Sequence, residues 1–137
     1  MTDYTNVLVA IDLSEESTVV AQRASSLAAN NNAQLHLIHV IEPLSFAYGG
    51  DIPMDFSGIQ DEIHQQAVQQ LKRFGETHNI DSEHQHIVLG RPEVEIHAQA
   101  EAVGADLIVV GSHGRYGLAL LMGSTANGVL HGANCDV

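Results

Sequence analysis

Short, continuous apolar runs alternate along the chain with longer stretches in which apolar residues recur at helical spacing. The short runs are rich in β-branched residues, which is typical of strands covered on both faces of a sheet. They predict four strands, at residues 6–11, 35–41, 85–90 and 104–111. The stretches between and after them predict helices, so the expected order is a strand followed by a helix, four times over.

The predicted helices have recognisable ends. Ser14 is placed to cap the first helix, and two glutamates follow it in the first turn, where the helix dipole favours acidic side chains. Three asparagines at 30–32 end that helix. Residues 43–56 contain two prolines and two adjacent glycines and predict a long loop, after which helical spacing returns at 59–74. Pro92 suits the first position of the next helix.

Strands that alternate with helices form a parallel sheet through right-handed crossovers. We therefore expect a single α/β domain over residues 1–137, with three layers: an open parallel sheet and helices on both of its faces. In such sheets, ligands bind beyond the carboxyl ends of the strands, at a topological switch point. By this rule, the candidate ligand-binding positions are residues 11–12, 40–42, 90–91 and the segment from 111 onward.

Composition fits this picture and excludes several partners. The chain has 137 residues, 45% of them apolar, and no Trp, which indicates an aliphatic core. Its formal charge of −12 argues against nucleic acid and anionic membranes, which are bound through Lys and Arg. Protonation of all nine histidines would bring this charge to −3. The first residues lack the basic and apolar regions of a signal peptide, and no apolar run is long enough to span a membrane, so we expect a cytoplasmic protein.

Two glycine clusters flank an apolar run behind the fourth strand. Gly111 and Gly114 belong to the first cluster. Residues 123–125, Gly-Ser-Thr, form the second and are expected to begin a last helix that ends near residue 132. Backbone N–H groups in such loops and at helix N-termini bind phosphate without basic side chains. The alternative is two tight turns that bind nothing.

The motifs of P-loop NTPases and of Rossmann dinucleotide-binding proteins are absent. Three segments instead resemble the universal stress protein family: VLVAIDLSEES near the start, LHLIHVIE in the middle, and ADLIVVGSHGRYGLALLMGSTANGVLHGANCDV at the end. The resemblance covers essentially the whole chain and is least clear at residues 43–56.

The resemblance implies strand order 3-2-1-4-5 and a homodimer formed through the fifth strand. Asp136 and Val137 look like the start of that strand, so we expect the rest of it to be missing here. One branch of the family binds ATP through the motif G-x2-G-x9-G-[ST]. Another branch lacks the motif and does not bind ATP. This chain has only eight residues between Gly114 and Gly123, but both clusters and their hydroxyls are present. We therefore favour binding of ATP, AMP or ADP, with Mg²⁺ offsetting the repulsion between the acidic chain and the phosphates.

The resemblance also implies where the nucleotide binds. It places Asp12 near the ribose, beside Ala10 and Ile11, and Val40 against the adenine. It assigns the phosphates to two loops, formed by Gly111, Ser112, His113, Gly114 and Arg115, and by Gly123, Ser124 and Thr125. Three simpler roles stay open: Asp12 could help Ser14 cap the first helix, Val40 also suits the core, and Arg115 could be a solvated loop charge.

We predict no catalytic residue and no metal site. His113 has no nucleophile and orienting acid in register with it. His84 and His86 would share one face of a strand, but no Cys or carboxylate follows at metal-ligand spacing. Cys135 is expected to be a buried thiol. The sequence thus predicts a protein with at most very weak ATP hydrolysis, which acts as a nucleotide-binding regulatory dimer on an unidentified protein client. The alternative is a nucleotide-free dimeric interaction module of the same family.

Overall fold

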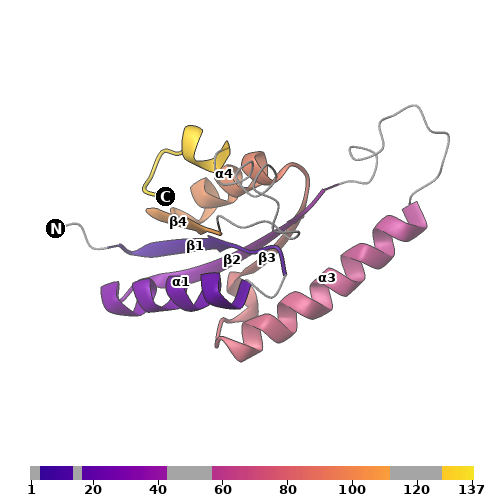
Figure 1. Ribbon diagram of the computed structural model, residues 1–137, viewed down its shortest axis with the longest axis horizontal. Coiled ribbons are helices and arrows are strands. Elements are labelled where there is room, and N and C mark those ends of the chain that lie inside the picture. The colour runs from indigo at the N-terminus through magenta and orange to yellow at the C-terminus, as the bar shows by residue number, and fades with distance from the viewer. Residues whose placement is uncertain (1–3, 14–16, 43–56, 112–127) are drawn as a thin grey trace.

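The computed structural model describes residues 4–13, 17–42, 57–111 and 128–137 (Figure 1). Strands and helices alternate as predicted. The elements are β1 (Asn6–Ala10), α1 (Ser17–Asn31), β2 (Gln34–Ile41), α3 (Ser57–Thr77), the 3-10 turn η1 (Ser82–His84), β3 (Gln85–Leu89), α4 (Pro92–Val103) and β4 (Leu107–Val110). Residues 128–131 are also helical, which agrees with the predicted end of the last helix.

The four strands form one parallel sheet in the order β3-β2-β1-β4. This confirms the predicted order for these strands. At the outer edge of β4, Asp136 forms an isolated parallel bridge with Leu107. The amide of Ile108 donates a hydrogen bond to the Asp136 carbonyl at 2.9 Å. The chain therefore begins to run beside β4 where the family resemblance implied a fifth strand.

The sheet separates two apolar layers, because successive residues of a strand point to opposite faces. Figure 1 shows α1 and α3 on one face of the sheet and α4 with the C-terminal segment on the other. The buried core of the first face consists of Val7, Val9, Ile11, Ala24, Ala28, Leu37, Leu71, Ile80 and Leu107. That of the second face consists of Leu8, Ile38, Ile96, Ala100, Ile108 and Val129. The predicted three-layer architecture is confirmed.

The ends of the described helices follow from local chemistry. Asn32, at the end of the asparagine run, has a φ of 55° and turns the chain out of α1. Pro92 opens α4 as predicted. Gly104 ends α4 with a φ of 67°, and its amide donates to the carbonyls of Ala100 and Glu101. No helix in the described ranges is long and apolar enough to cross a membrane.

Three predictions fall on parts of the chain that the structure does not describe. They are the cap at Ser14, the loop at residues 43–56 and the start of the last helix at Ser124. These remain predictions.

Candidate functional site

The order of the strands creates a switch point between β1 and β4. From β1 the chain moves to β2 and β3 through α1 and α3, on one face of the sheet. It then returns by α4, on the opposite face, to place β4 on the other side of β1. Beyond the carboxyl ends of β1 and β4, the helices diverge to opposite faces. A ligand can approach the strand ends at such a point.

Several of the predicted site residues meet at this switch point. Ala10 of β1 is in register with Val110 of β4. Ile11 and Asp12 directly follow β1, and Gly111 directly follows β4. The structure therefore brings the two segments that flank the switch point side by side.

Asp12 is held in place by the start of α1. The Ser17 hydroxyl donates a hydrogen bond to Asp12 Oδ1 at 2.9 Å, and Ser17 is only 2% exposed. Between these two residues, Leu13 has a φ of 61°, which is uncommon for a bulky side chain and turns the chain sharply. Asp12 therefore does bind the start of α1, through Ser17; Ser14 lies outside the described residues.

His39 ties the end of β2 to the end of β1. Its Nδ1 lies 2.9 Å from the carbonyl oxygen of Ile11, whose amide in turn donates to the Ile38 carbonyl at 3.0 Å. Since a carbonyl oxygen only accepts, the hydrogen bond requires the proton on Nδ1 of the imidazole. Ile11 is thereby fixed through both its amide and its carbonyl.

Sequence reasoning missed both Ser17 and His39. A signal for His39 was present, because a polar residue inside an otherwise apolar parallel strand needs a hydrogen-bond partner. Ser17 gave a weaker signal, as a hydroxyl five residues beyond Asp12.

Val40 of β2 has the core role that the sequence allowed for it. It is in register with Val88 of β3 and packs against the apolar cluster under α4. It is half-buried. Seven other candidate residues lie outside the described part of the chain: Ser112, His113, Gly114, Arg115, Gly123, Ser124 and Thr125.

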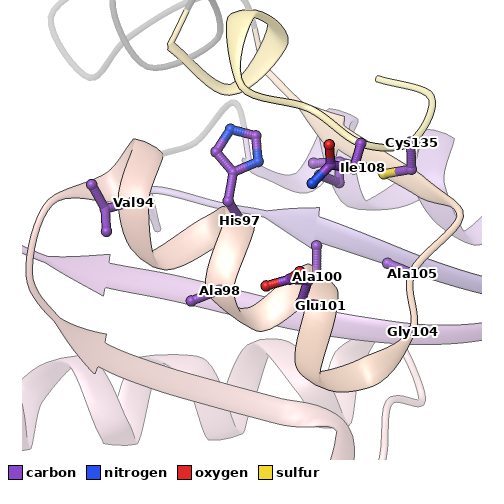
Figure 2. Close-up of a pocket in the computed structure, with 10 residues that line it drawn as sticks. Val94, His97, Ala98, Ala100, Glu101, Gly104, Ala105, Ile108 and Cys135 are labelled. Atoms are coloured by element: carbon purple, nitrogen blue, oxygen red, sulfur yellow. The ribbon is translucent and has the colours of Figure 1, made fainter.

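A separate cavity of about 520 Å³ lies between α4 and the C-terminal segment (Figure 2). Ala100, Ala105 and Ile108 contribute apolar surface, and Cys135 projects into the same region. Burial, followed by the charges of Asp136 and Asp106, raises the pKa of the half-buried Cys135 thiol. A raised pKa leaves less reactive thiolate at neutral pH. The cavity lies beside the start of β4, and none of the five predicted site residues that the structure describes lines it.

His84 and His86 share a face of the sheet edge and are joined there by His36 of β2. The ring centroids of His84 and His86 lie 4.4 Å and 5.9 Å from that of His36. Within the described ranges, no three His, Cys, Asp or Glu side chains are arranged to hold a metal ion. The cluster is therefore a group of imidazoles without an evident ligand.

The model of the universal stress protein family matches residues 3–137. Two relatives from Coxiella burnetii, universal stress protein A homologs 2 and 1, are each 43% identical to this chain. The matches cover 100% and 98% of this chain, respectively, and 94% of each relative.

Solved structures with the same fold include a universal stress protein, UspA, from Lactobacillus plantarum. It matches with a TM-score of 0.79 and 24% identity, over 100% of this chain and 97% of its own. A universal stress protein in complex with cAMP matches with a TM-score of 0.69 and 24% identity, over 99% of this chain and 95% of its own. At these identities the likeness concerns the fold.

Proposed function

Because the chain belongs to the universal stress protein family, we propose that it is a stress-response protein that binds an adenine nucleotide at the carboxyl edge of its sheet. The observation that carries this proposal is the juxtaposition of Ile11, Asp12 and Gly111 at the switch point between β1 and β4. The family member with the same fold that was crystallised in complex with cAMP supports a nucleotide as the class of ligand.

Each part of the proposed site suits one part of a nucleotide. Asp12 lies just beyond the end of β1, and its carboxylate is of the type that accepts a hydrogen bond from a ribose hydroxyl. Val40 offers apolar surface to the adenine. The loops at 111–115 and 123–125 supply backbone N–H groups for the phosphates, and Mg²⁺ offsets the repulsion from a chain of charge −12.

The test is titration calorimetry of the natural chain with ATP–Mg²⁺ and with AMP. We expect both ligands to bind and ATP to bind more tightly. Gly123→Val should weaken ATP binding far more than it lowers the melting temperature, because a branched Cβ collides with phosphate oxygens that approach the backbone. Absence of both heat and a thermal shift at millimolar ligand would refute nucleotide binding. Equal affinity for ATP and AMP would show that the phosphate loops contribute nothing.

The proposed role is regulatory binding in the cytoplasm, by a homodimer of this one domain acting on a protein client. Any ATP turnover should match that of a Ser124→Ala control, and light scattering should give twice the mass of the chain. Turnover well above that control would indicate an enzyme instead.

A second candidate, a nucleotide-free dimeric interaction module, is favoured by the glycine motif that is one residue short. It predicts that purified protein releases no adenine absorbance when it is denatured by acid, and that ATP leaves dimerisation unchanged. Retained nucleotide would exclude it.

A further inference from the structure

Three histidines from separate elements meet at the edge of the sheet. His36 lies in β2, His84 ends η1 and His86 lies in β3. The rings of His36 and His84 are tilted by 49° with centroids 4.4 Å apart, and those of His36 and His86 are stacked at 25° with centroids 5.9 Å apart. His86 is in register with Ile38, a member of the core under α4, so the rings lie on the α4 face.

Two of these rings each have a buried nitrogen without a hydrogen-bond partner, and the His36 ring as a whole is buried, whereas His86 is half-buried. His36 is 8% exposed and its Nδ1 is buried and unbonded, and the same is true of Nε2 of His86. A buried nitrogen without a partner already costs stability when the ring is neutral. Protonation would add a positive charge to the same poorly solvated place, which costs considerably more.

The elements packed around the cluster carry both apolar and titratable side chains. β1 presents the apolar Leu8 beside His36. The other titratable side chains of η1 and its cap, and of α4, are Asp81, Glu83, Glu93, Glu95, His97 and Glu101. In this setting burial, followed by the charges of His84 and His86, lowers the pKa of His36. Burial, followed by the charge of His84, lowers the pKa of His86.

We propose that His36, His84 and His86 form an acid-sensitive latch that holds η1 and β3 against β2. Near neutral pH the neutral rings of His36 and His86 stack across β2 and β3, and the ring of His84 packs against that of His36. In mild acid, like charges develop on neighbouring rings and drive η1 and β3 away from β2. In the described sheet β3 pairs only with β2, so it can separate while the β2-β1-β4 pairing persists.

The direction of the pH effect follows from proton linkage. A folded-state pKa below the usual 6.5 means that the unfolded chain binds more protons than the folded chain as the pH falls below 6.5. The stability due to the latch is therefore complete above about pH 6.5 and is lost on acidification. Each such histidine lowers the folding constant by up to about tenfold per pH unit.

The test compares urea unfolding at pH 7.5 and pH 5.5 for the natural chain, His36→Leu, His86→Gln and a control, His64→Gln. Leu is chosen because Leu8 and Ile38 surround position 36 on its face, and His64 is exposed on α3. We expect the natural chain and the control to lose up to about tenfold in folding constant on acidification for each of the two histidines whose pKa is lowered. Each latch variant should lose several-fold less.

Hydrogen exchange locates the effect. After correction for the intrinsic pH dependence of exchange, amides of residues 82–89 in the natural chain should exchange faster at pH 5.5, while those of β1 stay protected. Equal pH dependence in the natural chain and both latch variants would overturn the proposal. So would uniform acceleration over all four strands. A rise in the urea midpoint with ZnCl₂, absent from His36→Leu, would also overturn it, because the cluster would then be a metal site.

Discussion

Ser17 donates a hydrogen bond to Asp12, and it is one of two polar residues buried in the described core. We expect Ser17→Ala to lower the free energy of unfolding by about 1 kcal/mol, the usual value of one such hydrogen bond. Nucleotide affinity should also fall, because Asp12 loses the hydrogen bond from Ser17. Ser26→Ala, at an exposed position on the same helix, is the control for both measurements. Chemical unfolding measures the stability of each variant, and calorimetry measures its affinity for ATP. A Ser17→Ala variant that is less stable but binds ATP normally would show that the Ser17–Asp12 hydrogen bond does not matter for binding.

Asp106 joins the start of β1 to the start of β4. Its Oδ2 accepts from the Thr5 amide at 2.8 Å and from the Thr5 hydroxyl at 2.9 Å, and its Oδ1 accepts from the Asn6 amide at 3.1 Å. Desolvation acts to raise the pKa of this carboxyl, but the hydrogen bonds from Thr5 and Asn6 outweigh it and hold the pKa below its usual value. The charged form therefore stabilises the fold above about pH 3.8, and this stability is lost in stronger acid.

We accordingly expect Asp106→Asn to cost roughly 1 kcal/mol at pH 7, because charge-assisted hydrogen bonds are replaced by weaker neutral ones. The difference from the natural chain should shrink as the pH falls below 3.8, where the natural carboxyl also becomes neutral. Urea unfolding from pH 7 down to pH 3 measures this. A difference that stays constant over that range would mean that the carboxylate charge is not involved.

At the scale of elements, the positions of the strands could be predicted from the sequence, because they depend on the local pattern of apolar residues. The strand predicted at 35–41 begins one residue earlier, at Gln34, and that predicted at 6–11 ends one residue earlier, at Ala10. Continuous apolar runs identify buried strands well, because both faces of a parallel sheet exclude water.

Contacts between elements could not be predicted in the same way. The meeting of His36 with His86, and of His39 with the Ile11 carbonyl, depends on the register between strands. A shift by one residue would turn His36 to the opposite face of the sheet. An apolar run with few polar residues is compatible with more than one register. The sequence alone therefore did not predict that His36 would lie beside His84 and His86.

Gly104 lies at the C-terminal end of α4. Its φ of 67° suits glycine and disfavours side chains. The space around it is open, since a Cβ there would meet only the side-chain Nδ2 of Asn6, 4.0 Å away. We expect Gly104→Ala to lower the free energy of unfolding by about 1 kcal/mol through backbone strain alone. Gly58→Ala, inside α3 with nothing within 4 Å of the added Cβ, should instead raise stability slightly. Thermal melts of both variants measure these shifts, and an unchanged Gly104→Ala would contradict the strain.

At the scale of the whole molecule, the charge of −12 opposes folding by self-repulsion, and this effect responds to salt. At 1 M ionic strength the Debye length is about 3 Å, so repulsion between exposed carboxylates is largely screened. We expect the free energy of unfolding at pH 7.5 to rise between 0.05 M and 1 M NaCl. At pH 5.5 the gain should be smaller, because protonation of exposed histidines has already moved the charge toward −3.

Salt also separates the two effects of acid, which have opposite signs. Lowering the pH relieves surface repulsion, which stabilises the fold, but it also favours charge on the poorly solvated imidazoles of His36 and His86, which destabilises it. Salt screens the first effect far more than the second, because buried groups are poorly reached by ions. The stability lost between pH 7.5 and pH 5.5 should therefore be larger in 1 M NaCl than in 0.05 M NaCl, and His36→Leu should remove much of this salt-resistant loss. Urea unfolding at the four combinations of pH and salt measures this loss of stability at each salt concentration. An acid loss that is no larger in 1 M NaCl than in 0.05 M NaCl, or one that His36→Leu leaves unchanged, would contradict this prediction.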